Sequence, residues 1–215
     1  MIIAVDGPAA SGKGTLARRI ARELGYGHLD TGKLYRAVGM AVLRGGGDPS
    51  DAVAAAAAAR SLDPTMLDDP DLAGDEAAQA ASKVSAIPTV RAVLLDFQRD
   101  FAARPPGAVL DGRDIGTVVC PNADIKLYVI ASDEIRAQRR HKELLDRGKA
   151  SIYARVLQDL KERDARDSTR SVAPMKPAEG AVVLDTTVLD AEAAYAAAME
   201  CIHGVVAGAG DPAEQ

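Results

Sequence analysis

A glycine-rich run that ends in a lysine is the part of this sequence with the clearest chemical meaning. The run consists of Gly7-Pro8-Ala9-Ala10-Ser11-Gly12-Lys13-Gly14-Thr15, and it follows a short apolar stretch, residues 2–5. The pattern predicts a buried strand, then a glycine-rich loop, then a helix that begins at the lysine. Such an arrangement directs backbone N–H groups, the helix dipole and a full positive charge to one place. The group that such a loop binds is a nucleotide polyphosphate. A plain glycine turn is the alternative, and the lysine at the start of a helix disfavours it.

The spacing of this run narrows the class of protein. It fits G-x-x-x-x-G-K, but Gly14 occupies the next position and Thr15 follows one residue later. The hydroxyl that usually contacts Mg²⁺ is therefore displaced, and Thr15 is the candidate for that contact. The variant favours small-molecule kinases over GTPases and motor ATPases. A nucleotide-dependent switch protein is the alternative from another class, but the sequence lacks the Asn/Thr-Lys-x-Asp motif with which a GTPase recognises its base.

A second polar group follows the next apolar run, residues 27–29. It consists of Asp30-Thr31-Gly32-Lys33-Leu34-Tyr35-Arg36. Thr31, Tyr35 and Arg36 lie close together at helical spacing, at the carboxyl end of a predicted strand, where open α/β sheets bind ligands. An ordinary capped helix start is the alternative. Beside a phosphate loop, Arg36 is expected to be a second phosphate ligand.

A third strand, residues 108–110, ends in Asp111-Gly112-Arg113-Asp114. An acidic residue at such a strand end often orders Mg²⁺ through water, and Asp111 is the candidate for that role. A polar turn that satisfies itself by Asp–Arg pairing is the alternative.

A charged run near residue 165 carries the last group of candidates. Arg163, Asp167 and Arg170 are spaced i, i+4 and i+7, and they share one face if the helix continues; Arg166 lies beside Asp167. A solvated helix face is the alternative, but the number of arginines and the break at Pro174 favour a lid.

Five other residues stay undecided on pattern alone. They are Arg136, Arg139, Arg140, Ser82 and Arg91, each of which can face either an anion or solvent.

The elements that position these residues alternate between strand and helix. Apolar runs predict strands at 2–5, 27–29, 108–110, 125–130 and 181–184, with helices at 12–24, 30–43, 133–147, 151–167 and 191–202. This order predicts an α/β fold with a five-stranded parallel sheet and helices on both faces. Residues 45–106 differ, and we expect an inserted helical lobe: an Ala-rich stretch at 52–59, an irregular acidic loop at 63–75, and helix over 82–104 interrupted at Pro88. The expected core is 1–44 with 107–215, and the expected lid is 148–172.

Composition excludes several classes of protein. The 215 residues are 47% hydrophobic, which suits one medium domain, and no apolar run approaches a membrane span. The two cysteines and three scattered histidines predict neither a disulfide framework nor a zinc site. The first residues do not resemble a secretion leader, so we expect a cytoplasmic location. A formal charge of −5, 3% aromatic residues and no Trp disfavour nucleic acid as a partner.

Taken together, these motifs resemble the bacterial-type cytidylate kinases, a family of nucleoside monophosphate kinases. The resemblance runs nearly from end to end, and its most specific parts are GPAASGKGT at 7–15, DTGKLYR at 30–36, LDGRDIGTVVCPNAD at 110–124 and KERDARDSTRSVAP at 161–174. It implies the P-loop nucleoside monophosphate kinase fold, with an inserted lobe for the monophosphate and a short lid. The chain departs from the family at Ala9, where enterobacterial-type members carry Ser, and in 45–106, which lacks the strands of longer members.

The resemblance also implies a role for each candidate. The loop from Gly7 to Thr15 would hold the ATP phosphates, with Mg²⁺ near Thr15 and Asp111. The phosphate of CMP would be bound by Arg36, Arg113 and Arg170. Cytosine would be recognised by Ser82, Arg91 and Asp114. The sugar would be contacted by Arg163 and Asp167, and the acceptor pocket lined by Thr31 and Tyr35. The expected catalytic cations are Lys13, Arg113, Arg163, Arg166 and Arg170.

The implied reaction is ATP + CMP → ADP + CDP, with dCMP as a further acceptor, in a monomer that binds only small nucleotides. A phosphate monoester has a second pKa of about 6, so the attacking oxygen is mostly ionised at neutral pH and needs no general base. The barrier is repulsion between two polyanions, which several cations offset. One alternative is a kinase of the same fold that acts on another monophosphate. A second is a protein of this fold without activity, which the presence of Lys13 and all the arginines disfavours.

Overall fold

The computed structural model describes residues 1–209 and contains a five-stranded sheet in which every pair of neighbours is parallel. The strands are β1 (Ile2–Asp6), β2 (Gly27–Asp30), β3 (Ala108–Gly112), β4 (Ile125–Ile130) and β5 (Val182–Asp185), and they lie in the order β2-β3-β1-β4-β5. The predicted α/β fold is therefore confirmed, with small shifts at the strand ends. Residues 210–215, which the sequence assigned to the core, lie outside the described part.

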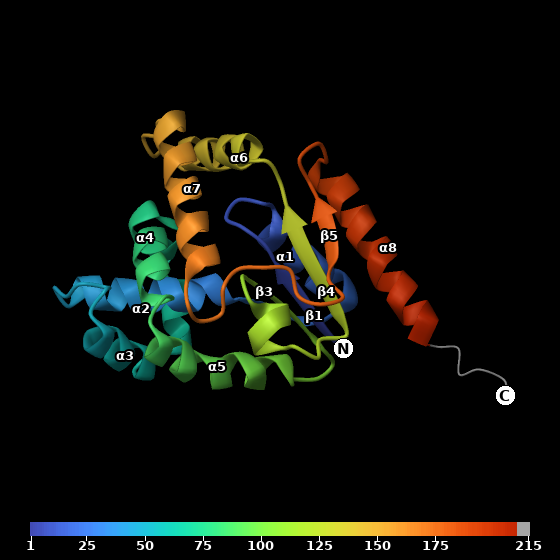
Figure 1. Ribbon diagram of the computed structural model, residues 1–215, viewed down its shortest axis with the longest axis horizontal. Coiled ribbons are helices and arrows are strands. Elements are labelled where there is room, and N and C mark those ends of the chain that lie inside the picture. Colours follow the sequence, from blue (N-terminus) through green and yellow to red (C-terminus); the bar gives the residue numbers. More distant parts are fainter. Residues whose placement is uncertain (210–215) are drawn as a thin grey trace.

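Helices cover both faces of the sheet because side chains alternate along each strand (Figure 1). Ile3 and Val5 of β1 pack with α1 (Lys13–Leu24) and α8 (Ala191–Ala209) on one face. Ala4, between them, packs with α2 (Thr31–Arg44) and α5 (Pro88–Ala102) on the other. All three side chains are fully buried, as expected for a parallel sheet with two covered faces.

The acidic stretch 63–75 is more ordered than the sequence predicted. After α3 (Ala52–Arg60) it forms two short 3-10 turns, Pro64–Asp68 and Pro70–Ala73. Each turn begins with a proline behind an aspartate, and the Oδ1 atoms of Asp63 and Asp69 accept from the backbone N–H groups of Thr65 and Asp71 at 2.8 Å. Proline fixes the first turn and the carboxylate caps it, so a segment expected to be irregular acquires local structure.

The helix predicted over 82–104 is also divided differently. It consists of α4 (Asp75–Val84) and α5, and the chain leaves helical geometry before Pro88 rather than at it. Pro88 starts α5, because the first residue of a helix needs no backbone N–H donor.

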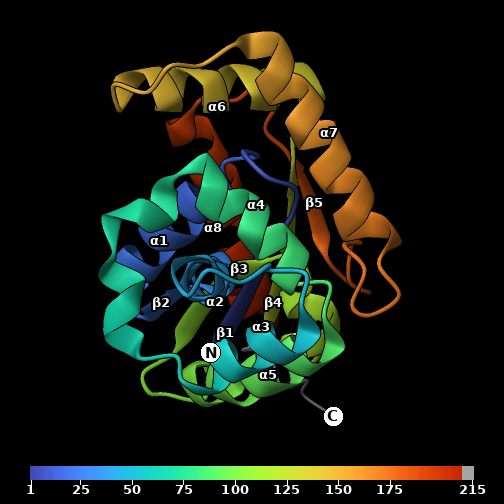
Figure 2. The same ribbon diagram turned by 90° about the vertical axis from the view of Figure 1, so that its left-hand side faces the viewer.

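Helices α6 (Asp133–Asp146) and α7 (Tyr153–Thr169) form an arm over the end of the sheet from which the 7–12 loop emerges (Figure 2). Ala137 and Leu144 of α6 pack against Val156 and Leu160 of α7, and Ala9 of the loop joins the same cluster. Helix α7 ends at Thr169 and does not continue to Arg170, so the helical face that a longer helix would have given these residues is not formed; Arg170 has an extended backbone, with φ −60° and ψ 143°. Across the described residues, no helix is both long and apolar enough to span a membrane.

Candidate active site

A cleft of about 690 Å³ opens at the carboxyl ends of β1, β2 and β3. Its walls come from the loop after β1, the start of α2, the end of β3, the 3-10 segment and the arm of α6 and α7. Lys and Arg outnumber Asp and Glu among the residues that line it, although the whole chain carries a formal charge of −5. The cleft is thus a local basic cluster of the kind that an anionic ligand requires.

The loop between β1 and α1 is shaped by close backbone packing. At Gly7, φ is +147°, and a Cβ would lie 2.0 Å from the carbonyl oxygen of Val129, so only glycine fits. Lys13 is buried at the start of α1, and its Nζ donates to the carbonyl oxygen of Pro8 at 3.1 Å. Burial, helped by the charge of Arg113, lowers the pKa of Lys13 to about 7. A bound polyphosphate would reverse this shift, since it brings negative charge to the ammonium group.

Residues far along the chain brace this loop. Nη1 of Arg136 donates to the carbonyl oxygen of Ala9 at 3.1 Å, and the Thr186 hydroxyl donates to that of Ser11 at 3.0 Å. Arg139 also contacts Thr186, with 3.0 Å between Nη1 and Oγ1. The sequence left both arginines undecided and did not find Thr186. No local pattern marks a threonine whose partner lies 175 residues away.

The polar group after β2 lies on the opposite side of the cleft from the arm. Asp30 caps α2, since its Oδ1 accepts from the N–H of Lys33 at 3.2 Å, and the hydroxyl of Thr31 donates to the carbonyl oxygen of Asp111 at 2.8 Å. Tyr35 is buried, with the Arg91 guanidinium 5.5 Å from its ring centre. Arg36 lines the cleft, and its Nε is a buried atom without an acceptor within the described residues. An unpaired buried donor in a cleft favours an anionic ligand.

Asp111 lies at the end of β3 with its two oxygens in different surroundings. Oδ1 lies 2.8 Å from Nε2 of His28 on the neighbouring strand β2. Oδ2 lies beside the phosphate loop, because a Cβ added at Gly14 would be 3.4 Å from it. The sequence did not predict the contact with His28, because it depends on the register of β2 against β3.

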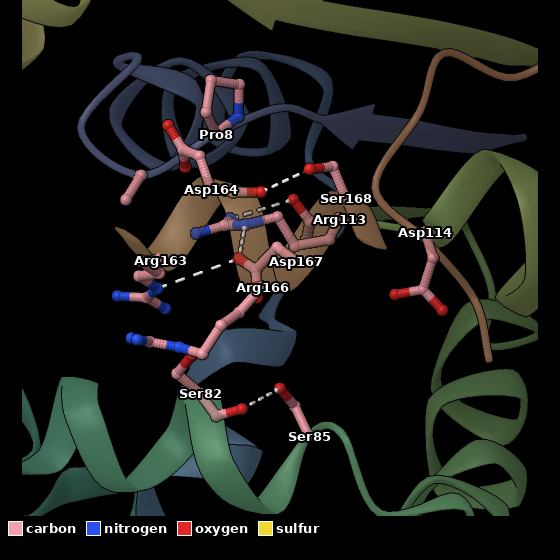
Figure 3. A network of polar contacts seen from close by, with 12 residues as sticks. Pro8, Ser82, Ser85, Arg113, Asp114, Arg163, Asp164, Arg166, Asp167 and Ser168 are labelled. Atoms are coloured by element: carbon pink, nitrogen blue, oxygen red, sulfur yellow. Dashed lines mark hydrogen bonds and ion pairs between the residues drawn. The ribbon is translucent and has the colours of Figure 1, made fainter. Parts of the chain in front are cut away.

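Arg113, Arg163 and Asp167 form a compact charged group between the loop and α7 (Figure 3). Nε of Arg113 donates to Oδ2 of Asp167 at 2.9 Å, and Nε of Arg163 lies 3.8 Å from the same oxygen. Burial, and then the charge of Arg113, lower the pKa of Arg163. Although burial opposes it, the two arginines lower the pKa of Asp167. One carboxylate is thus shared by two guanidinium groups, which leaves positive charge available in the cleft.

Asp114 forms a second ion-pair group deeper in the cleft. It pairs with Arg91, and its Oδ1 lies 3.5 Å from Nη2 of Arg170. Arg170 therefore reaches the cleft from the extended segment after α7 rather than from a shared helix face.

Ser82 and Arg166 contact each other instead of lining the cleft. Nε of Arg166 donates to Oγ of Ser82 at 3.1 Å, and its Nη2 donates to Oε1 of Gln79 at 3.3 Å. Figure 3 labels both residues, with Ser82 on α4 and Arg166 reaching towards it from α7. Their hydrogen bonds join α4 to α7.

Most of the predicted site residues are brought together. Those that line the cleft are Ala9, Ala10, Gly12, Lys13, Gly14, Thr15, Thr31, Tyr35, Arg36, Arg91, Asp111, Arg113, Asp114, Arg163, Asp167 and Arg170. Gly7, Pro8 and Ser11 belong to the same loop but do not line the cleft.

A parallel sheet, a phosphate loop ending in a buried lysine and a cleft rich in arginine define a P-loop phosphotransferase of the nucleotide kinase class. A family model described as cytidylate kinase matches residues 3–204. The cytidylate kinase of Paramagnetospirillum magneticum is 63% identical over 204 residues, which cover 94% of this chain and 97% of that protein. That of Rhodospirillum rubrum is 63% identical over 206 residues, with the same coverage of both chains. The chain belongs to the cytidylate kinase family.

A solved structure supports the fold alone. The crystal structure of an uncharacterized protein from Eubacterium ventriosum aligns with a TM-score of 0.52 at 13% identity, over 94% of this chain and 98% of the other. Family membership confirms the predicted class: the protein is an enzyme, a phosphotransferase that phosphorylates CMP with ATP as the donor.

Proposed function

We propose that ATP and CMP meet in this cleft and react to ADP and CDP, and that dCMP is also an acceptor. The observation that carries the proposal is the excess of Lys and Arg over Asp and Glu among the residues that line the cleft. Two unit charges about 4 Å apart repel by about 4 kcal/mol at an effective dielectric constant of 20, and each nucleotide carries more than one. Lysine and arginine side chains placed on several sides of the reacting phosphates offset that repulsion.

On the donor side, the proposal assigns the ATP phosphates to the loop from Gly7 to Thr15. The backbone N–H groups at the start of α1 and the ammonium group of Lys13 bind the phosphate oxygens. The buried position of Lys13 supports this role, because an ammonium group is costly to bury unless an anion joins it.

On the acceptor side, the proposal assigns the phosphate of CMP to Arg36, Arg113 and Arg170. The unpaired Nε of Arg36 and the arginine excess beside Asp167 support this assignment. Arg163 and Asp167 hold the sugar, and Arg113, Arg163 and Arg170 stabilise the charge that develops during transfer. Thr31 and Tyr35 form the wall behind the acceptor.

Asp114 is proposed to select the base. Cytosine carries an exocyclic amine where uracil carries an oxygen, so a carboxylate accepts from the first and repels the second. The ion pair with Arg91 holds the carboxyl group of Asp114 in the cleft, which supports this role. The proposal assigns Ser82 to base recognition and Arg166 to the catalytic set; the hydrogen bond between them already joins α4 to α7.

Mg²⁺ fits the residues that the cleft offers. It is usually bound by one or two carboxylates together with substrate phosphates rather than by an all-protein cage. Among the described residues, no group of three or more His, Cys, Asp or Glu could hold a metal ion, but Asp111 offers one oxygen beside the loop. Asp111, through water, and Thr15 would hold the ion, which would supply neutralising charge to the phosphates.

Residues 148–172, which contain α7, are proposed to act as a lid against the 45–106 lobe, and residues 1–44 and 107–215 to form the core. Arg140 pairs with Asp75, and Nη1 of Arg147 donates to the carbonyl oxygen of Ala73 at 3.1 Å. Such contacts favour a closed cleft that excludes water, the competing acceptor. The same proposal describes a cytoplasmic monomer whose partners are nucleotides, without membrane or nucleic acid.

The test is an acceptor panel. Purified protein with ATP and Mg²⁺ is given CMP, dCMP, UMP, AMP or dTMP, and both ADP release and the new diphosphate are measured. We expect the highest kcat/KM with CMP, followed by dCMP, and little ADP without an acceptor. A preference for AMP would support an adenylate-type enzyme, and no diphosphate from any acceptor would contradict the proposal.

A further inference from the structure

Asp6, the last residue of β1, has a contact that the proposed mechanism does not use. Its backbone continues directly into Gly7 of the phosphate loop, whereas its carboxylate accepts hydrogen bonds from the segment that follows β3. Oδ1 accepts from the N–H of Ile115 and Oδ2 from that of Gly116, both at 2.8 Å. Only 3% of the residue is exposed. The register that pairs Asp6 with Gly112 brings the two segments together.

These two N–H groups belong to an unusual piece of backbone. Residues Ile115–Val119 form a single π-turn, closed by the N–H of Cys120 donating to the carbonyl oxygen of Ile115 at 2.7 Å. Single π-turns are rare and occur mainly at functional sites. The first N–H groups of any helical turn have no partner within it, so they need an acceptor from elsewhere. Asp6 supplies that acceptor with both of its oxygens.

The residue whose geometry this arrangement fixes is Asp114. Its carbonyl group and the N–H of Ile115 belong to one planar peptide unit, so they turn together. On one side of that unit the N–H is held by Asp6; on the other, the carbonyl oxygen accepts from Val118 at 2.9 Å and Val119 at 3.2 Å. Rotation of the peptide after Asp114 would break all three hydrogen bonds.

Keeping a carboxylate at this position is costly. Burial raises the pKa of Asp6 to about 6, although the two backbone hydrogen bonds oppose that shift. A neutral amide of the same size would avoid the cost of burying a charge, but it has one acceptor oxygen where the carboxylate has two. The arrangement therefore favours a specific geometric role for the two oxygens.

We propose that Asp6 is a positioning residue for base selection: it holds the turn from which Asp114 meets the exocyclic amine of cytosine. The inference rests on the proposed role of Asp114. Because Asp6 also precedes Gly7, one residue sets the place of the base-selecting carboxylate relative to the phosphate loop.

The central test is Asp6→Asn, which keeps the shape and removes one acceptor. The side-chain NH₂ of Asn would face a backbone N–H, so the π-turn would be held less firmly. Asp114 would then no longer be fixed in the orientation that contacts the amine of cytosine. With ATP and Mg²⁺ present, we expect the ratio of kcat/KM for CMP to that for UMP to fall about 10-fold, through a higher KM for CMP. The KM for ATP should change by less than about 2-fold, because the substitution Asp6→Asn acts on the acceptor side.

A double variant separates this role from a general loss of structure. If Asp6 acts through Asp114, then Asp6→Asn combined with Asp114→Ala should have the same CMP/UMP selectivity as Asp114→Ala alone. A matched control is Asp124→Asn, because Oδ2 of Asp124 accepts from the N–H of Ile2 at 2.6 Å at the other end of β1. That variant should have the kinetics of the wild type.

Wild-type selectivity in Asp6→Asn, or a further loss of selectivity in the double variant, would overturn the proposal. If Asp6→Asn does not fold, amide exchange on the wild type without ATP, so that no acceptor is consumed, answers the question. Saturating CMP should slow exchange at Ile115 and Gly116 more than saturating UMP, and equal exchange with both would overturn the proposal. A wild-type enzyme that forms no CDP would instead contradict the proposed function.

Discussion

The guanidinium group of Arg136 on α6 donates to the carbonyl oxygen of Ala9 in the phosphate loop, 3.1 Å away. The residue is only 3% exposed, and its Nη2 lies 2.6 Å from Oδ2 of Asp164 on α7. One side chain thus joins the phosphate loop to both helices of the arm that α6 and α7 form. The hydrogen bond from Arg136 restrains the loop at Ala9, and such a restraint helps its backbone N–H groups to point to one place.

Replacing Arg136 should therefore cost both stability and activity. In Arg136→Met, Asp164 loses its cation and the Ala9 carbonyl loses a donor, so we expect the free energy of unfolding to fall by about 1–3 kcal/mol. Urea unfolding measures this change. Arg155→Met, an exposed position on α7, is the control and should stay within about 0.5 kcal/mol of the wild type. Equal effects of the two substitutions would show that the brace contributes nothing.

Lys13→Ala should abolish turnover and leave CMP binding measurable. In the proposed mechanism the ammonium group neutralises the donor phosphates, so its loss should lower kcat by about 10²–10³-fold or more. Calorimetry with CMP alone reports the acceptor side, which we expect to be nearly unchanged. Lys142→Ala, exposed on α6, is the control. A normal kcat in Lys13→Ala would exclude the loop from catalysis.

Binding of ATP should be linked to the uptake of a proton by Lys13. Its pKa is lowered to about 7 in the free protein, so at pH 8 the amine is mostly neutral. Bound phosphates raise that pKa, which means that ATP binding takes up protons and weakens as the pH rises above 7. Titration calorimetry in buffers of different ionisation enthalpy measures the uptake, expected to approach about one proton per nucleotide near pH 8. Lys13→Ala should lose it, and an unchanged uptake in that variant would assign the proton to another group.

Asp114→Ala should weaken the preference for CMP over UMP. One good polar contact to a base discriminates by about 1–3 kcal/mol, so the ratio of kcat/KM values should fall about 5- to 150-fold. Steady-state kinetics with both acceptors measure it. Asp96→Ala, exposed on α5, should leave the ratio unchanged. An unchanged ratio in Asp114→Ala would refute the assignment of the base-selecting carboxylate.

Arg170→Ala should chiefly raise the KM for CMP. The guanidinium group lies 3.5 Å from Asp114 and is held by the carbonyl oxygen of Ala173 at 2.6 Å, so it is aimed at the acceptor side. A lost charge-assisted hydrogen bond of about 1.5–3 kcal/mol corresponds to an increase of about 10- to 150-fold. An effect confined to the KM for ATP would move this arginine to the donor side.

Local patterns predicted the parts of the site that depend on neighbours in sequence. The loop from Gly7 to Thr15, the capped start of α2 and the polar end of β3 each follow from a few adjacent residues. The ends of helices were predicted less accurately. The interruption expected at Pro88 lies just before it, because Pro88 starts α5, and α7 ends at Thr169, two residues beyond the predicted end and before Arg170.

The contacts that orient the site could not be predicted from the pattern of a single sequence. Asp6 with Ile115, His28 with Asp111 and Arg136 with Ala9 each join residues that are far apart along the chain. Each of them needs a strand register or a helix position that no short segment specifies by itself.

The sequence alone determined which residues carry charge, which loop is the candidate for binding phosphate and which segments form the strands of a parallel sheet. Glycine, proline and alternating apolar residues act over a few positions, and so their effects can be predicted locally. Only the tertiary structure decided which cations face the cleft, which carboxylates they share and which buried groups hold the phosphate loop and Asp114 in place. Those choices depend on burial and on the meeting of distant segments, and both exist only when the whole chain has packed.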